Sequence, residues 1–554
     1  MRLRYSGLGQ RLRGRPATRG RHPPGGGHTG AVATSSGIAT LRPVLLKSLI
    51  SAIPASDLVD PVVGLDTEVA GLCNDSRKVS SGDLFLALPG SRINGARFVE
   101  QALEAGAVAV LADRSLPARP RLLRCDNTAR NAGLLADAFY GRPSSELALV
   151  GITGTNGKTS CAWLLESIWR AAGIEAGIMG TLDARCSTFA RPALLTTPGC
   201  VELQATLADF RAAACEAVAM EVSSHALEQQ RVSGCRFDTA VFTNLTRDHL
   251  DYHADEQAYF DAKALLFTEH LAGDSVAVIN HDDPWGHRLL GRLGSSTEAW
   301  TWSTVQGEKA CVTLRQLELG LDGIRAVVDL RGRRLGIRSC LLGAVNVSNM
   351  LAAIAVASSM GVDDGCIVRG LADCAPVPGR MERVGQGGPV VLVDYAHTPD
   401  ALERTLRALK SQVEGRLLVV FGCGGDRDKG KRAMMGEVAG RLADVAVLTS
   451  DNPRTEDPET ILDDIEQGTL SSMSLLKHAT GSGYLREADR GAAIRSAIGM
   501  ASPADVVVVA GKGHEDYQET DGVRAPFDDR LVVAEVLDQG RPGNGTRATA
   551  QAGE

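Results

Sequence analysis

A short stretch of the chain has the residue types and the spacing of a phosphate-binding loop. It runs Gly154, Thr155, Asn156, Gly157, Lys158 and Thr159. Glycines let the backbone approach a phosphate closely, a lysine adds a point charge to the outer oxygens, and a threonine hydroxyl can ligate Mg²⁺. The chemistry that this set predicts is the binding of a nucleoside triphosphate together with Mg²⁺.

The segments on either side of the loop predict how it is held. The apolar run 147 to 150 predicts a buried strand, and residues 160 to 172 predict a helix that ends at Gly173. The loop then lies at a helix N-terminus, where free N–H groups and the helix dipole favour phosphate. Ile152 stands where the longer form of the motif has glycine, so a plain glycine turn between strand and helix is the alternative.

The composition limits the classes of protein to which the chain can belong. Its 554 residues are too many for one hydrophobic core and predict about three domains. A formal net charge of -7 disfavours a nucleic-acid partner, which needs a clustered basic surface. The 12 cysteines form no C-x-x-C pair, no signal peptide is recognisable, and no apolar run reaches the ~18 residues of a membrane span. We therefore expect a cytoplasmic protein with small-molecule substrates and no nucleic-acid or membrane partner.

Short apolar runs that end in polar, glycine-rich loops alternate with helical stretches along the chain. The clearest runs are 147 to 150, 417 to 421, 445 to 448 and 506 to 510. Apolar strands that alternate with helices predict mostly parallel sheets covered on both faces, and therefore an α/β fold. Proline and glycine near 141 to 145 and 376 to 379 predict two boundaries. The predicted domains are residues 46 to 142, 143 to 378 and 379 to 540.

The two ends of the chain lack the composition of a folded core. Residues 1 to 45 form a basic extension whose first 40 residues are rich in Arg, Gly and Pro and contain no Asp or Glu. Residues 541 to 554 are polar and rich in glycine. We expect both segments to be disordered. An organelle transit peptide is the alternative for the N-terminal extension.

Further motifs follow the phosphate loop in order. They are EVSSH at 221 to 225, NLTRDHLDYH at 244 to 253, GAVNVSN at 343 to 349, GRMER at 379 to 383 and DYAHTP at 394 to 399. From about Asn74 to Arg530 the chain resembles the Mur ligases of peptidoglycan synthesis. The resemblance implies an ATP-dependent ligase that phosphorylates a carboxylate and lets an amine displace the phosphate. It also implies a UDP-sugar-binding first domain, a central P-loop ATPase domain with a parallel sheet, a C-terminal Rossmann-like domain, and a monomer.

The resemblance implies roles for residues around the nucleotide. Glu221 and His249 are expected at Mg²⁺ together with Thr159, and Lys263 is expected to bind CO₂ as a carbamate and to hold a second Mg²⁺. Carbamylation requires an unprotonated, partly desolvated amine. The expected catalytic residues are Lys158, Glu221, His249 and Lys263. The expected ATP contacts in the phosphate loop are Gly154, Thr155, Asn156, Gly157, Lys158, Thr159 and Ser160. The resemblance further places Asn346 and Asn349 near the adenine, Arg380 near the phosphates and Asp394 on the ribose.

The carboxylate substrate implied by the resemblance is UDP-N-acetylmuramoyl-L-alanyl-D-glutamate. Its expected contacts lie on the first domain and the facing side of the second: Asn74, Ser76, Ser91, Arg92, Ile93, Thr196, Thr197, Ser223, Gln229 and Arg231. Some relatives carry asparagine immediately before the paired threonines, where this chain has Leu195. That departure puts one local contact in doubt, and leaves the expected substrate unchanged.

Three loops of the last domain follow predicted strands and carry residues that suit an amino acid. Meso-2,6-diaminopimelate has a second amino-acid head that lysine lacks. An arginine suits its carboxylate and an acid suits its ammonium, and Arg454 and Glu515 supply these types. The quartet at 451 to 454 resembles the motif of family members that join diaminopimelate to the D-glutamate γ-carboxylate. The expected contacts are Arg427, Asp451, Asn452, Pro453, Arg454, Gly511 and Glu515.

Three other functions remain open at this point. The same ligase could use L-lysine, although relatives that do so typically lack the arginine of the quartet. A folylpolyglutamate synthase-like ligase shares the nucleotide machinery but is not expected to carry the quartet beside residues 511 to 515. A non-catalytic plastid interaction protein is suggested only by the basic extension, and the intact Lys158, Glu221, His249 and Lys263 oppose it.

Overall fold

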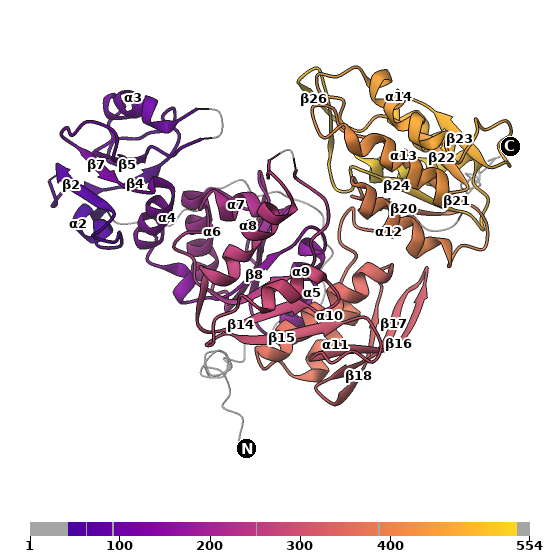
Figure 1. Cartoon of the computed structure of the whole chain (residues 1–554), viewed down its shortest axis with the longest axis horizontal. Helices are drawn as coiled ribbons and strands as arrows, with labels where there is room; N and C mark the ends of the chain where they lie inside the picture. Colours follow the sequence, from indigo (N-terminus) through magenta and orange to yellow (C-terminus); the bar gives the residue numbers. More distant parts are fainter. Residues whose placement is uncertain (1–42, 63, 91–92, 251, 386–387, 540–554) are drawn as a thin grey trace, which may run out of the picture.

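The computed structural model describes residues 43 to 539, apart from residues 63, 91–92, 251 and 386–387. Three bodies follow one another along the chain, from the N-terminal one through the central one to the C-terminal one (Figure 1). The terminal segments 1 to 42 and 540 to 554 lie outside the described residues. They include most of the two segments that are expected to be disordered. Ser91 and Arg92 lie outside them as well.

The N-terminal body is built on a five-stranded sheet in the order β2-β7-β6-β5-β4. The strands from β7 to β4 pair in parallel, and β2 pairs with β7 antiparallel. Its elements are β1 (Val44–Leu45), α2 (Leu46–Ile50), β2 (Leu58–Val62), β3 (Glu68–Val69), β4 (Gly71–Cys73), β5 (Asp83–Leu86), α3 (Val99–Glu104), β6 (Ala109–Asp113), β7 (Leu122–Cys125) and α4 (Thr128–Phe139).

The central body contains an 11-stranded sheet in the order β11-β10-β9-β12-β8-β13-β14-β15-β16-β17-β18. Its elements are β8 (Ala148–Thr153), α5 (Lys158–Ala171), β9 (Ala176–Met179), β10 (Asp183–Arg185), β11 (Ala190–Pro192), α6 (Cys200–Ala212), β12 (Ala217–Glu221), α7 (Ser224–Glu228), β13 (Phe237–Phe242), α8 (Glu256–Thr268), β14 (Leu271–Asn280), α9 (Pro284–Leu290), β15 (Glu298–Ser303), β16 (Val312–Gly320), β17 (Gly323–Leu330), β18 (Arg333–Ser339), α10 (Ala344–Ser359) and α11 (Asp364–Asp373).

Helices cover both faces of the middle of this sheet, and successive strand residues face opposite sides. Val150 and Ile152 of β8 pack in one core with α5, α10 and α11. Leu149 packs in the other core with α6, α7, α8 and α9. The strands from β9 through β12, β8, β13, β14 and β15 to β16 pair in parallel. Because both faces are covered, these strands are almost continuously apolar.

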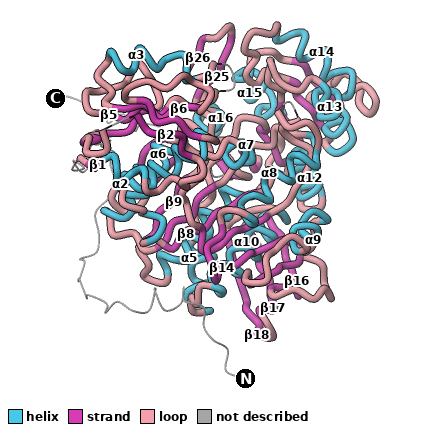
Figure 2. The backbone as a smooth tube through the Cα atoms, turned by 60° about the vertical axis from the view of Figure 1, so that its left-hand side comes forward, coloured by secondary structure: helices cyan, strands magenta, loops and turns pink. Residues whose placement is uncertain are grey.

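The two ends of the central sheet depart from the expected parallel pairing. The β9–β11 end and the β16–β18 end are antiparallel. Figure 2 shows β16, β17 and β18 extending from one end of the molecule. Strand β18 alternates exposed and buried residues along its length, as expected where one face of an antiparallel sheet meets water.

The C-terminal body has a six-stranded sheet in the order β19-β20-β24-β21-β22-β23, parallel except for β19. Helices α12, α13 and α14 pack on one face, and α15 and α16 pack on the other. Its elements are β19 (Glu382–Val384), β20 (Val390–Asp394), α12 (Pro399–Lys410), β21 (Leu417–Phe421), α13 (Gly430–Leu442), β22 (Val445–Leu448), α14 (Pro458–Thr469), β23 (Gly483–Arg486), α15 (Arg490–Met500), β24 (Val506–Ala510), β25 (Tyr517–Thr520), β26 (Val523–Pro526) and α16 (Asp529–Gln539).

The predicted α/β class is confirmed, and the predicted strands at 417 to 421, 445 to 448 and 506 to 510 coincide with β21, β22 and β24. The strand before the phosphate loop was predicted to end at Val150, but β8 continues to Thr153 because Gly151 and Ile152 pair with β12 and β13. The following helix begins at Lys158, two residues before the predicted start. Among the described helices, none combines the length and the apolar character that crossing a bilayer requires.

Candidate functional site

The phosphate loop connects the C-terminal end of β8 to the N-terminus of α5. Gly154 and Gly157 have φ angles of 140° and 90°, a region that favours glycine. A Cβ at Gly154 would lie 1.9 Å from Thr243 Oγ1, and one at Gly157 would lie 2.4 Å from Asn349 Oδ1. Both glycines are therefore required by the backbone conformation and by close neighbours. The N-terminus of α5 presents its free N–H groups here, as the sequence predicts.

Glu221, at the end of β12, lies beside this helix terminus and is only 1% exposed. Its Oε2 accepts hydrogen bonds from Thr159 Oγ1 at 3.1 Å and from Thr181 Oγ1 at 2.9 Å. Its Oε1 accepts from the Thr181 backbone N–H at 2.9 Å. These three donors fix the carboxylate next to the threonine hydroxyl of the phosphate loop. Thr181 has no signal in the sequence, because it reaches Glu221 only through the pairing of β9 with β12.

The donor set around Glu221 fits a magnesium ion better than a fully protein-coordinated metal. Hard oxygen donors lie side by side in Glu221 and Thr159, while no group of three His, Cys, Asp or Glu suited to a metal occurs within the described part of the chain. Magnesium takes few protein ligands and keeps waters and phosphate oxygens for the remaining positions. The expected role of these two residues at Mg²⁺ is compatible with the site and remains a prediction.

Lys263, on α8, lies behind the phosphate loop with its side chain 1% exposed. Its Nζ donates to the Gly154 carbonyl at 2.9 Å and lies 4.3 Å from the centre of the Tyr259 ring. Burial lowers the pKa of Lys263 well below its usual value, and the charge of Lys158 lowers it further. Burial therefore favours the uncharged form of this amine, which is the form that a carbamate requires.

His249 lies in a cluster of rings at the edge of the same site, with its side chain 45% exposed. The ring centre of His225 lies 4.9 Å away and that of Tyr259 6.1 Å away. Surrounding groups desolvate the imidazole and lower its pKa, and Asp248 opposes that shift. A neutral imidazole can donate a lone pair to a metal ion. The backbone of His249 has a φ of 55°, in the left-handed region that residues other than glycine rarely adopt.

A cavity of about 1060 Å³ opens between the central and C-terminal bodies. It brings together nearly all of the predicted nucleotide contacts: Thr155, Asn156, Gly157, Lys158, Thr159, Ser160, Asn346, Asn349, Arg380 and Asp394, along with Glu221 and His249. Three leucines of β16, Leu314, Leu317 and Leu319, form an apolar part of its wall. Sequence analysis did not identify these leucines, because they lie on a strand outside every motif.

The nucleotide contacts expected at the far end of the cavity are held by bonds within the chain. Asn349 Nδ2 donates to Asn346 Oδ1 at 3.0 Å, and both are buried on α10. Asp394 Oδ2 accepts from Thr405 Oγ1 at 2.7 Å. Burial raises the pKa of Asp394, and the Thr405 hydrogen bond opposes the rise. The guanidinium of Arg380 lies 4.4 Å above the Tyr395 ring centre.

The expected contacts of the UDP-sugar substrate form a connected group on the central body. Thr197 Oγ1 donates to the Glu221 carbonyl at 2.9 Å and accepts from the Ser223 N–H at 3.0 Å. Arg231 donates to the Thr197 carbonyl and, at 2.6 Å, to Gln229 Oε1. The hydroxyl of Thr196 lies 3.2 Å from that of Thr181. These residues therefore lie next to Glu221, whose carboxylate accepts hydrogen bonds from Thr181.

The N-terminal body reaches this group through Asn74. A Cβ on Gly199 would lie 3.7 Å from Asn74 Nδ2, so the residue faces the segment after the paired threonines. Ser76 Oγ donates to Gln101 Oε1 at 3.0 Å, and Ile93 is exposed on its loop. Ser91 and Arg92, which belong to the same expected set, lie outside the described residues.

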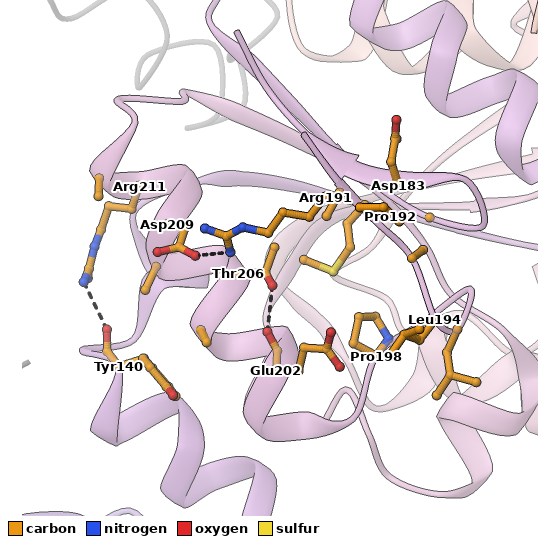
Figure 3. Close-up of a pocket in the computed structure, with 18 residues that line it drawn as sticks. Tyr140, Asp183, Arg191, Pro192, Leu194, Pro198, Glu202, Thr206, Asp209 and Arg211 are labelled. Carbon is orange, nitrogen blue, oxygen red and sulfur yellow. Dashed lines mark hydrogen bonds and ion pairs between the residues drawn. The ribbon is translucent and has the colours of Figure 1, made fainter. Parts of the chain in front are cut away.

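A second cavity, of about 320 Å³, lies between α6 and the β10–β11 hairpin (Figure 3). Arg191 extends across it to Asp209, with a distance of 2.6 Å between Nη1 and Oδ2. Leu194 and Pro198 form part of an apolar side, and Leu195 also lines the cavity. Leu195, which stands where some relatives carry asparagine, thus lines this cavity and directly precedes Thr196.

The loops at the carboxyl ends of β21, β22 and β24 converge in the C-terminal body. Arg454 Nη1 donates to the Gly425 carbonyl at 2.7 Å, and a Cβ on Gly424 would lie 2.8 Å from that nitrogen and 3.7 Å from Arg427 Cγ. The two arginines therefore flank one glycine turn. A Cβ on Gly511 would lie 2.6 Å from Asp451 Oδ2, so that glycine leaves room for the carboxylate.

Beneath these loops lies a fully buried ion pair that sequence analysis missed. Arg490 Nη2 and Asp529 Oδ2 are 2.7 Å apart, and both side chains are 0% exposed. Arg490 also donates to the carbonyls of Ser450 and Ala510, the residues that precede Asp451 and Gly511. One guanidinium thus holds the ends of two loops together. Nothing in the spacing of these residues along the chain indicates the contact.

Family models match three successive parts of the chain. They are described as the Mur ligase family catalytic domain, at residues 68–134, the Mur ligase middle domain, at 152–357, and the Mur ligase glutamate ligase domain, at 379–513. A UDP-N-acetylmuramoyl-L-alanyl-D-glutamate–2,6-diaminopimelate ligase of Synechococcus elongatus is 46% identical over 505 residues, which cover 88% of this chain and 99% of the relative. The chain belongs to the Mur ligase family.

Solved structures of Mur ligases resemble the whole described fold. A structure titled as a UDP-N-acetylmuramoyl-L-alanyl-D-glutamate–2,6-diaminopimelate ligase is 34% identical, with a TM-score of 0.65, over 90% of this chain and 99% of that one. A MurF ligase from Thermotoga maritima in complex with ADP is 18% identical with a TM-score of 0.58, over 85% of this chain and 97% of that one. At this identity the second likeness concerns the fold alone. The three-domain Mur ligase architecture is therefore confirmed.

Proposed function

We propose that this Mur ligase joins meso-2,6-diaminopimelate to the D-glutamate γ-carboxylate of UDP-N-acetylmuramoyl-L-alanyl-D-glutamate with hydrolysis of ATP to ADP and phosphate. The observation that carries the proposal is the coexistence of two sites in one chain. The phosphate loop lies against Glu221, and the loops of Arg427, Arg454 and Glu515 converge in the C-terminal body. The name of the Synechococcus relative supports the same reaction.

In the first step of this reaction, the substrate γ-carboxylate attacks the γ-phosphorus of ATP. An acyl phosphate forms and ADP leaves. Lys158 and Arg380 supply positive charge next to the phosphates, where negative charge gathers during the transfer. The N–H groups at the start of α5 hold the phosphates in place. Thr159, Glu221 and His249 would hold magnesium, which would supply further positive charge there.

In the second step, an amine of diaminopimelate attacks the acyl carbon, and inorganic phosphate leaves. The amine loses a proton as the amide forms. Arg427 and Arg454 take the carboxylate of the distant head, and Glu515 takes its ammonium. Because this head is fixed, the other amine is presented to the acyl phosphate. L-Lysine lacks the distant carboxylate, and we expect it to bind poorly.

We assign Lys263 the role of a carbamate. The uncharged amine adds to CO₂ and releases one proton, which leaves an anionic oxygen pair behind the phosphate loop. The burial and lowered pKa of Lys263 support this assignment. The carbamate would then join Glu221 and His249 in holding magnesium. We further propose that the enzyme acts as a monomer in the cytoplasm, with domains at residues 46 to 142, 143 to 378 and 379 to 540.

The proposal is tested by following phosphate release and product mass in parallel. Purified enzyme receives ATP, Mg²⁺ and the UDP-muramoyl dipeptide, with diaminopimelate, L-lysine or L-ornithine as the amine. We expect phosphate and a new amide product only when the dipeptide and diaminopimelate are both present. Preference for lysine would overturn the amino-acid assignment, and activity with folylglutamate in place of the dipeptide would overturn the substrate assignment.

A further inference from the structure

Lys512 is a buried cation that no step described above uses. Its side chain is 0% exposed, and it follows Gly511 in the loop that connects β24 to Glu515. Nζ donates to Glu515 Oε2 at 3.0 Å and to Asn452 Oδ1 at 3.1 Å. The Tyr517 ring centre lies 5.3 Å from the same nitrogen. A lysine withdrawn from water in this way is stable only when it is paired and hydrogen-bonded, as it is here.

Asn452 closes a triangle with Lys512 and Glu515. Its Nδ2 donates to Glu515 Oε2 at 2.8 Å, the same oxygen that Lys512 binds. Its Oδ1 accepts from Lys512 and from the Glu519 backbone N–H at 3.0 Å. Because both partners of Oδ1 are donors, only one orientation of the amide satisfies the set. The amide of Asn452 is therefore engaged with the chain itself, and it acts on the amino-acid site through Glu515.

The triangle divides the two oxygens of the Glu515 carboxylate. Oε2 receives the bonds from both Lys512 and Asn452, while Oε1 takes part in neither. Glu515 remains 20% exposed, so that part of its side chain is accessible from the site. A carboxylate anchored through one oxygen keeps its other oxygen in a constant direction. It then binds a ligand without first losing side-chain freedom.

We propose that Lys512 is a positioning residue that fixes Glu515 so that Oε1 accepts the ammonium on the distant head of the amino-acid substrate. The inference rests on the proposed function and adds that different residues recognise the two charged groups of the distant head. The arginines Arg427 and Arg454 select the distant carboxylate, whereas the triangle selects the distant ammonium.

A substrate pair that differs only in the distant amine tests this division. L-2-Aminopimelate keeps both carboxylates and the reacting amine of diaminopimelate but has hydrogen in place of the second amine. We expect Lys512→Met to raise the KM for diaminopimelate about tenfold or more, the usual cost of losing a hydrogen bond to a charged group. The kcat/KM ratio of diaminopimelate over 2-aminopimelate should fall by about the same factor. The KM values for ATP and for the UDP-muramoyl dipeptide should change less than about twofold.

Three further variants separate positioning from general damage. Glu515→Gln removes the anionic acceptor, and in that background Lys512→Met should have little additional effect on the diaminopimelate KM, because both changes interrupt one interaction. Lys477→Met removes an exposed lysine of the same domain and should leave all three KM values unchanged. Lys512→Arg, which keeps the charge and its donors, should recover part of the preference for diaminopimelate.

The outcomes distinguish this inference from the proposed function. If wild-type enzyme releases no phosphate with diaminopimelate, the proposed function fails and the triangle loses its ligand. If wild-type enzyme is active but Lys512→Met preserves the preference for diaminopimelate over 2-aminopimelate, Lys512 is not a positioning residue. Additive losses in the Glu515→Gln background would lead to the same conclusion. A parallel rise in all KM values, with a lower melting temperature, would show that Lys512 serves only the stability of the domain.

Discussion

Lys158 and Lys263 donate hydrogen bonds to the same carbonyl oxygen, that of Gly154, at 3.0 and 2.9 Å. The two ammonium groups cannot share so small a space in a buried site without a large electrostatic cost. The pKa of each is lowered by burial, and that of Lys263 falls well below its usual value. The phosphate loop is therefore flanked by Lys158, which faces the large cavity, and by Lys263 behind it, whose burial favours the uncharged amine.

The lowered pKa of Lys263 predicts a pH dependence of stability. Between this lowered pKa and about pH 10, the unfolded chain protonates the amine and the folded chain does not, so unfolding takes up a proton and stability rises with pH. Lys263→Met should flatten this rise below about pH 10, measured as the free energy of unfolding in urea. The variant should also lose ligase activity. An unchanged slope would show that Lys263 is protonated in the folded protein.

The same amine predicts a dependence of activity on carbon dioxide. Enzyme degassed and assayed in CO₂-free buffer should lose activity, and bicarbonate should restore it, because the carbamate re-forms. A carbamate resonance should appear by NMR after addition of ¹³C-bicarbonate and should be missing from Lys263→Met. Full activity without CO₂ would contradict the assignment of a carbamate.

Gly154 predicts a strict steric requirement in the phosphate loop. Gly154→Ala would place a Cβ 1.9 Å from Thr243 Oγ1 at a φ of 140°, so we expect loss of ATP binding and destabilisation by about 2 kcal/mol or more. Gly173→Ala is the matched control, since Gly173 also has a positive φ, 73°, but no atom lies within 4 Å of the added carbon. It should cost only about 1 kcal/mol and leave the KM for ATP unchanged. Isothermal titration with a nonhydrolysable ATP analogue measures the difference.

Arg454 predicts the choice of amino acid. Arg454→Ala should raise the KM for diaminopimelate by about tenfold to a hundredfold, because it removes a charge-assisted partner of the distant carboxylate, while the KM for ATP stays nearly constant. The smaller activity with L-lysine, which lacks that carboxylate, should hardly change. Steady-state kinetics with both amines provide the comparison. Equal losses for ATP and diaminopimelate would indicate misfolding of the loop, whose Arg454 backbone has a φ of 55°.

The buried pair of Arg490 and Asp529 predicts a large stability effect in the C-terminal domain. Arg490→Met leaves the Asp529 carboxylate buried without its partner and should cost about 3 to 5 kcal/mol. Arg407→Met, which removes a helical surface pair with Glu403, should cost less than about 0.5 kcal/mol. Chemical denaturation monitored by circular dichroism compares the two. Similar losses would show that the buried pair is not an anchor for the two loops above it.

Local spacing along the chain was sufficient to predict the strands β21, β22 and β24 and the glycine loop before α5. An apolar run of strand length that ends in a polar loop is a local property, and so is a glycine that permits a positive φ. The family resemblance then assigned the motifs to a nucleotide, a UDP-sugar peptide and an amino acid. It predicted Lys263 as a carbamate, but it contained no information on the burial that makes the amine reactive.

Only the tertiary structure decided which side chains meet. Lys263 reaches Gly154 across 109 positions of sequence because α8 packs on the sheet face beside β8. Thr181 binds Glu221 across 40 positions because parallel strand pairing brings the ends of β9 and β12 to one edge. Lys512 meets Asn452 across 60 positions for the same reason. Sequence alone predicted a phosphate-binding loop and the charged residues that we propose for an amino-acid site. Packing decided that the lysine behind the loop is buried and that Glu515 is bonded through one oxygen to Lys512 and Asn452.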